Sequence, residues 1–146
     1  MISKKYTYKE DPVSATEQVL YKLIATLMTI RKCQKISMPK LQVYLWGLKN
    51  DGNKQVLIQW KKSQKITGAP WMEENDVPQL ITQCITNHYV RIETNKSGTV
   101  SYKLDYASTP VLQAVKGTDI ERLITSDLDE IGKITDKALT NIEFDF

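Results

Sequence analysis

Apolar residues recur at helical spacing near the start of the chain. Ser14 and Glu17 have the spacing of a capping box, in which the hydroxyl and the carboxylate accept hydrogen bonds from backbone N–H groups at a helix start. Six apolar residues then follow three and four positions apart, which predicts one buried stripe. They are Val19, Leu20, Leu23, Ile24, Leu27 and Met28. We therefore interpret this segment as the core helix of the fold.

Two further helices are expected before residue 66. Ser37 is a typical N-cap residue and Pro39 is tolerated in a first turn, so a second helix should start there and end at the turn sequence of residues 50–52. Its apolar positions are Leu41, Tyr44, Leu45 and Leu48. Residues 53–65 fit either a strand or a short helix, and we favour the helix. The inward face of that helix would hold Val56, Leu57 and Trp60.

A linker with turn chemistry, ITGAPW, precedes the next helix. Asp76 with Gln79 forms a second capping signal and Pro78 is acceptable in the first turn, so we expect a helix over about 77–88. Its buried face would hold Leu80, Ile81, Cys84 and Ile85.

Strict alternation then predicts a β-hairpin over about 88–105. One face of this hairpin is apolar and the other is polar. The apolar face holds Val90, Ile92, Val100, Tyr102 and Leu104. The sequence NKSG supplies the turn, with Gly98 expected at positive φ because glycine adopts that conformation without steric cost.

Two helical segments and an alternating tail follow the hairpin. Thr109 before Pro110 predicts the start of a short helix that ends at Gly117, and Ser126 is expected to cap a last helix. The apolar positions of that last helix are Leu128, Ile131, Ile134, Ala138 and Ile142. The tail alternates Ile142, Phe144 and Phe146, which fits either a docking strand for a partner or packing back onto its own domain.

The order helix, helix, linker, helix, hairpin, helix is that of a winged helix-turn-helix domain. The expected fold class is therefore mainly α with one β-hairpin, with an added C-terminal helix. We divide the chain into an N-terminal tail (1–13), the winged-helix domain (14–117), a C-terminal helical extension (118–142) and a tail (143–146).

Composition fits one hydrophobic core. The chain has 146 residues, of which 41% are hydrophobic and 25% charged. No apolar run approaches the roughly 18 to 20 residues that span a bilayer, and the N-terminus lacks an apolar signal core, so we expect a cytoplasmic protein without a membrane partner. Cys33 and Cys84 have no CxxC spacing and are interpreted as reduced thiols.

Charge is distributed unevenly along the chain. Residues 1–65 hold 13 Lys/Arg against 4 Asp/Glu, whereas residues 66–146 hold 7 against 13. The cations of the first half could contact nucleic acid without reading sequence, or they could form an ordinary solvated surface. The candidates there are Lys49, Lys54, Lys61, Lys62 and Lys65, and on the hairpin Arg91, Lys96 and Lys103.

The helix before the hairpin weakens the case for reading DNA. In a winged helix that reads the major groove this helix enters the groove, but residues 77–88 contain no Lys or Arg and follow Glu73, Glu74 and Asp76. Acidic side chains at that position would repel the phosphate backbone. Adenine contacts from polar residues of the helix stay open: Gln79, Gln83 and Asn87.

Candidate catalytic chemistry is sparse. His88 is the only histidine, which excludes a histidine-rich metal cluster. No Ser or Cys lies in a nucleophile-elbow pattern, and the glycines are scattered, so no phosphate loop is formed. We expect neither an enzyme nor a bound cofactor or metal.

Several segments resemble a known family. KLQVYLWGLKN (40–50) resembles the second helix of the small winged-helix subunits, the middle components, of bacterial three-component systems built around an SMC- or Rad50-like ATPase. PWMEENDVPQLITQCITNHYVRIE (70–93) with YKL resembles their helix and wing, and DLDEIGKITDKALTNI (127–142) their closing helix. The family pattern closes the wing with Leu-Thr and a nearby Gly, whereas this chain has Leu104-Asp105.

The resemblance implies a non-enzymatic adaptor that binds the ATPase and an effector in an antiviral or anti-plasmid defence system of the Lamassu type. Trp46 is expected in the core and Trp71 at an interface, with Ile142, Phe144 and Phe146 as further partner-binding candidates. Two alternatives are a winged-helix transcription regulator and a subunit that contacts DNA independently of sequence.

Overall fold

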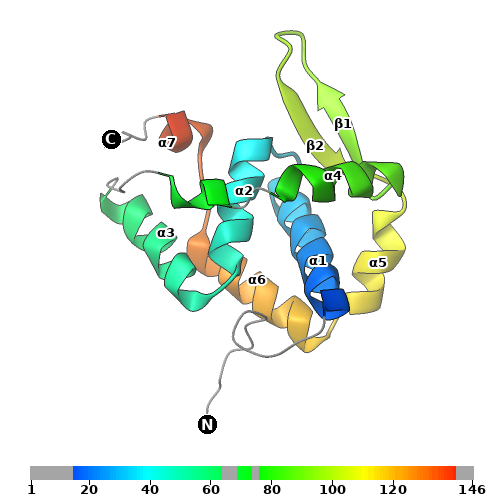
Figure 1. Ribbon diagram of the computed structural model, residues 1–146, viewed down its shortest axis with the longest axis horizontal. Coiled ribbons are helices and arrows are strands. Elements are labelled where there is room, and N and C mark those ends of the chain that lie inside the picture. The colour runs from blue at the N-terminus through cyan, green and yellow to red at the C-terminus, as the bar shows by residue number, and fades with distance from the viewer. Residues whose placement is uncertain (1–14, 64–68, 74–75, 141–146) are drawn as a thin grey trace.

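The computed structural model describes residues 15–63, 69–73 and 76–140 (Figure 1). These residues form a mainly α protein with seven helices and one antiparallel hairpin, as expected. The elements in chain order are α1 (Ala15–Cys33), α2 (Met38–Leu48), α3 (Asp51–Ser63), the 3-10 turn η1 (Pro70–Glu73), α4 (Val77–Thr86), β1 (Val90–Thr94), β2 (Val100–Leu104), α5 (Ser108–Val115), α6 (Asp119–Ile131) and α7 (Asp136–Thr140). Within these ranges no helix combines the length and the apolar character needed to cross a membrane.

Residues 24–30 of α1 are buried on every side. Ile24, Leu27 and Met28 lie in the core as expected, and even Thr26 and Thr29 are buried. Helical backbone carbonyls accept the hydrogen bonds of these two hydroxyls, each from four residues earlier, which removes the cost of burying them.

The expected burial of Val19 and Leu20 was wrong. Both residues are exposed, because the first turns of α1 extend beside α4 and not beneath the core. A shallow groove lies between the two helices there, and Lys22 forms an ion pair with Asp76 across it.

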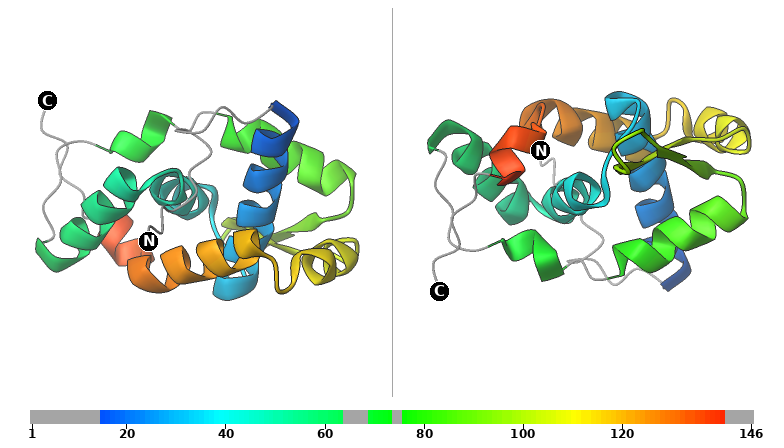
Figure 2. Two further views of the ribbon diagram at one scale, coloured as in Figure 1. Left: turned by 90° about the horizontal axis from the view of Figure 1, so that it is seen from below. Right: turned by 90° about the horizontal axis from the view of Figure 1, so that it is seen from above.

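Helix α2 begins and packs as predicted. The Ser37 hydroxyl accepts a hydrogen bond from the Lys40 N–H at 3.4 Å, and a proline lies in the first turn. Nearly the whole helix is buried: Leu41, Val43, Tyr44, Leu45, Trp46, Gly47 and Leu48. Figure 2 shows α2 surrounded by the other helices. It is therefore the centre of the helical body.

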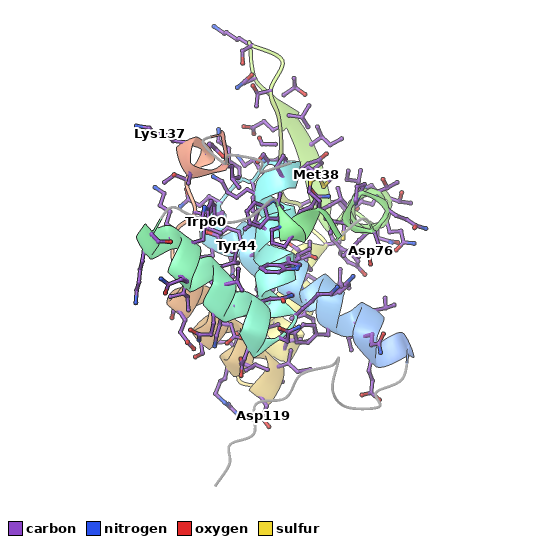
Figure 3. All side chains as sticks on the ribbon, turned by 60° about the vertical axis from the view of Figure 1, so that its left-hand side comes forward. Met38, Tyr44, Trp60, Asp76, Asp119 and Lys137 are labelled. Carbon is purple, nitrogen blue, oxygen red and sulfur yellow. The ribbon has the colours of Figure 1, made fainter. Side chains whose placement is uncertain are left out.

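The ambiguous third segment is a helix, as we favoured. It starts earlier than expected, at Asp51, because the Asn50 side chain accepts a hydrogen bond from the Asn53 N–H at 2.8 Å. Leu57 and Trp60 point inward, but Val56 is exposed. Figure 3 shows Trp60 near Tyr44 within the body, with Lys137 at its periphery.

Three tryptophans pack together where η1 meets α2 and α3. The ring of Trp71 lies 5.3 Å from that of Trp60 and 6.4 Å from that of Trp46, between centroids. Trp46 is a core residue as expected. Trp71 was expected at an interface, yet its exposed fraction is 3%, because η1 folds it under the surface. In this structure Trp71 belongs to the core.

The hairpin forms where it was predicted, and Ile92 lies opposite Tyr102 in its antiparallel register. Gly98 has a φ of +86°, and the Asn95 carboxamide oxygen accepts hydrogen bonds from the N–H groups of Ser97 and Thr99. Ile36, in the segment between α1 and α2, exchanges two backbone hydrogen bonds with Tyr102. A single residue thereby extends the sheet on the β2 side.

The predicted last helix was placed wrongly. Ser126 lies inside α6, whose N-cap residue, Thr118, comes eight residues earlier in the chain. The Thr118 hydroxyl accepts from the Glu121 N–H, and the Glu121 carboxylate accepts from the Gly117 N–H, so this pair closes the helix start. Gly132, at a φ of +73°, ends α6, and α7 is a separate short helix.

We expect replacement of Trp71 with alanine to lower the free energy of unfolding by about 3–5 kcal/mol, because it empties a tightly packed ring site. Met72→Ala is the matched control, since Met72 is the next residue of the same turn and is 65% exposed. Its effect should stay within about 0.5 kcal/mol. Urea unfolding followed by circular dichroism measures both. Equal effects of the two substitutions would show that Trp71 is not a core residue.

Candidate interaction surfaces

The apolar face of the hairpin extends beyond the core that covers its base. At the base of the face that was predicted to be apolar, Val90 is buried beside its cross-strand partner Leu104. Further along the strands, Ile92 is 53% exposed and Val100 is 41% exposed. Figure 1 shows why, because the hairpin stands out from the helices and no helix covers its outer part. Two β-branched side chains therefore face outward on one surface.

The outer face of α4 is neutral. The hydroxyls of Thr82 and Thr86 donate to carbonyls of their own helix, and the Asn87 amide donates to the Gln83 carbonyl. At the helix start, burial alone would raise the pKa of Asp76, but the Lys22 ammonium holds it below the usual value. The carboxylate is thus ionised and already paired.

Lysines of the first half of the chain pair with acids of the second half. Four surface pairs of this kind join distant segments: Lys22 with Asp76, Lys32 with Asp129 (2.8 Å), Lys35 with Glu93 (3.9 Å) and Lys40 with Asp136 (3.0 Å). Surface pairs contribute only about 0–1 kcal/mol each. Each pair nevertheless joins a cation of the first half to an acid of the second half, so much of the charge asymmetry is balanced within the molecule.

Lys54, one of the candidate nucleic-acid contacts, is instead buried between α3 and α6. Its exposed fraction is 3%, and its Nζ lies 3.0 Å from an Asp127 oxygen and 3.1 Å from a Glu130 oxygen. Asp51 is 3.6 Å away. Lys61 also turns inward: its Nζ donates to the Ile131 carbonyl at 2.7 Å, and desolvation lowers its pKa. Both lysines hold α3 against α6.

The other predicted cations are scattered. Lys49 is half-buried, Lys62 is exposed and Lys96 lies exposed in the hairpin turn. Lys103 pairs with Glu93 at 3.3 Å. Lys65 lies outside the described residues. So do the partner-binding candidates of the tail, Ile142, Phe144 and Phe146.

One groove brings cations together. A cavity of about 660 Å³ opens between the end of α1, the base of the hairpin, α5 and the start of α6. Arg31, Arg91 and Lys116 line it, and none of them forms an ion pair with a described residue. The two acids of the same groove are held by backbone groups, since Asp105 accepts from the Tyr106 N–H and Glu121 from the Gly117 N–H.

Sequence reasoning found only one member of this basic groove. Arg91 was a candidate as a hairpin residue, whereas Arg31 and Lys116 were not singled out. They come from the last turn of α1 and the residue after α5, elements far apart in the chain. No local motif connects such residues, so only the packing of α5 beside the hairpin reveals the groove.

His88 lies in the turn between α4 and β1. Its φ is +62°, and its ring stacks on Tyr106 with 5.3 Å between centroids. The described residues contain no group of metal-ligating side chains. Burial raises the pKa of the Cys84 thiol to about 11, so this thiol is protonated at neutral pH.

We expect Lys54→Met to lower the free energy of unfolding by about 3–5 kcal/mol, because it leaves Asp127 buried without its charge partner. The double variant Lys54→Met with Asp127→Leu should recover most of this loss, since it replaces a buried ion pair by apolar contact. Lys62→Met, an exposed position of the same helix, should be nearly neutral. Urea unfolding followed by tryptophan fluorescence distinguishes these outcomes. A single variant as stable as the parent would contradict the structural role of Lys54.

Comparisons with known proteins give no further guide to these surfaces. Neither the models of protein families, nor the curated proteins, nor the solved structures contain a significant match to this chain. The hairpin, the neutral face of α4 and the basic groove are the surfaces from which a function can be inferred.

Proposed function

We propose that this chain is a non-enzymatic winged-helix adaptor subunit that links an SMC-like ATPase to an effector in a bacterial defence complex. The winged-helix arrangement is supported by the Ile36 bridge, which gives the order α1, short strand, α2, α4, β1, β2. Helix α3 and η1 are inserted between α2 and α4. In this interpretation β1 and β2 are the wing, and α4 is the helix that a DNA-reading member would place in the major groove.

The observation that carries the adaptor proposal is the exposed apolar face of the wing. Ile92 and Val100 add nothing to the core, and neighbouring apolar exposure on a soluble domain is typical of a protein contact. The neutral face of α4 also favours a protein partner over DNA, because DNA affinity depends on cations that contact phosphates. An adaptor needs an exposed apolar surface for its partner. A regulator that reads the major groove instead needs cations on α4 that contact phosphates.

The identity of the partners rests on sequence resemblance alone. Residues 40–50, 70–93 and 127–142 resemble the middle components of SMC-like ATPase systems. The described residues of these ranges lie in and just after α2, between η1 and β1, and in the region of α6 and α7. They thus contribute both to the core and to the wing, and they include Ile92 of the surface that we assign to the partner.

We expect a tagged copy of the protein, purified from its native host at physiological salt, to co-elute with a stoichiometric ATPase that contains long coiled coils. Ile92→Asp should remove this partner, because it places a charge in the proposed contact. Val56→Asp is the matched control, since Val56 is an exposed apolar residue on α3, away from the wing. Mass spectrometry of the eluate identifies the partner. Elution of the parent protein alone, or retention of the partner by Ile92→Asp, contradicts the proposal.

A second candidate function is contact with the DNA backbone through the basic groove. The observation that favours it is the set of three cations without acid partners, Arg31, Arg91 and Lys116, beside the wing. Backbone contacts bring affinity without sequence preference. The third possibility is a transcription regulator, which would contact bases through Gln79, Gln83 and Asn87 in the region around α4. The Asn87 amide, however, already donates a hydrogen bond to the Gln83 carbonyl.

If the groove contacts phosphates, binding to any duplex should weaken steeply as salt rises. Arg31→Glu with Arg91→Glu should reduce the slope of log K against log salt by about two, because each phosphate contact adds roughly one to it. Lys62→Glu, exposed on α3, should leave the slope unchanged. Fluorescence anisotropy with two unrelated duplexes measures both slope and preference. No binding excludes this function, and a sequence preference lost on Gln83→Ala would favour the regulator.

A further inference from the structure

The outer edge of β1 is open. Tyr102 uses its backbone N–H and C=O to pair with Ile36, on the side of β2 away from β1. Residues opposite each other in an antiparallel pair alternate between bonded and non-bonded positions. Ile92, opposite Tyr102, therefore directs its own backbone groups outward from the other side of the sheet. In the described part of the chain no strand pairs with this edge.

The two faces beside this edge differ in chemistry. Ile92 and Val100 make one face apolar and exposed. On the opposite face lie Arg91 and its cross-strand neighbour Lys103, with Glu93 already shared between Lys103 and Lys35. Arg91 has no acid partner among the described residues. A strand that completes this edge should thus be apolar on one side and acidic on the other.

The C-terminal segment of the chain has this pattern. Residues 142–146 read Ile-Glu-Phe-Asp-Phe. In an extended conformation successive side chains point to opposite faces, so Ile142, Phe144 and Phe146 share one face while Glu143 and Asp145 share the other. If this segment paired with β1, its apolar side chains would extend the apolar face next to Ile92, and its carboxylates would lie on the face of Arg91.

We propose that residues 142–146 of one copy add as a strand to the open edge of β1 in a second copy. A second copy is favoured over the same chain by the position of α7, which precedes this segment. Figure 1 shows α7 on the β2 side of the hairpin, so β2 lies between it and the open edge of β1. The contacts agree, because α7 packs against α2, and Ile36 just before α2 pairs with Tyr102 of β2. Reciprocal exchange of the two segments closes a two-fold dimer. The dimer forms without the ATPase and is independent of the adaptor proposal.

The test is a charge exchange in the full-length chain. Arg91→Glu alone and Glu143→Lys with Asp145→Lys alone each place like charges across the new strand pair, and each should weaken dimerisation at least tenfold. An equimolar mixture of the two variants should restore it, because each segment then meets a strand of opposite charge in the other chain. Lys62→Glu, a similar charge change on α3, should dimerise like the parent protein.

Size-exclusion chromatography with light scattering gives the mass of each sample over a range of concentrations. A dimeric parent, two weakened variants and a restored mixture support the proposal. A monomeric parent overturns it, and so does a dimer that ignores the tail substitutions or a mixture that stays monomeric. Circular dichroism of each variant checks that its helices are intact, so loss of dimer cannot be mistaken for unfolding.

Discussion

The enclosure of α2 determines where the other helices can lie. Because nearly every side of α2 is apolar and buried, it needs neighbours all round, and α1, α3, α6 and η1 provide them. Gly47 sets how closely two of these neighbours approach. A Cβ at this position would lie 2.3 Å from a methyl carbon of Leu57 and 3.1 Å from one of Ile131. Helices α3 and α6 can therefore meet over the glycine with their own side chains.

Tyr44 connects the central helix α2 to the segment between α6 and α7. Its hydroxyl donates to the Gly132 carbonyl at 3.0 Å and accepts from the Ile134 N–H at 3.0 Å. Burial raises the pKa of this phenol to about 12, so the hydroxyl keeps its proton at physiological pH. One side chain of the central helix thus satisfies backbone groups on both sides of the break between α6 and α7, where the helical ladder cannot.

Local chemistry predicted the elements, and long-range packing determined their burial. Ser37 and Gly98 act through neighbouring backbone groups, so their roles were readable from the sequence. The helix capped by Thr118 was missed because Ser126 offers an equally good local signal, and packing chose between them. Lys54 shows the limit most clearly. Its partner Asp127 lies 73 residues away, and a lysine on a polar helix carries no sign of burial.

The interaction surfaces likewise differ in how far the sequence predicted them. Alternation in the hairpin predicted its apolar face correctly, but only its base is covered by the body. The basic groove could not be predicted, since its cations come from three separate elements.

The covered base of the hairpin contributes to stability, whereas its exposed outer part is left for recognition. The core is closed by Val90 and Leu104 at the base of the hairpin, so Ile92 and Val100 contribute little to folding. Exposing β-branched apolar side chains offers the isolated chain no gain in free energy, because their burial is what the hydrophobic effect favours. Their position is explained if another protein surface covers them. The same outer part of the hairpin presents the open edge of β1, so both proposed contacts lie on the part of the sheet that the fold itself does not need.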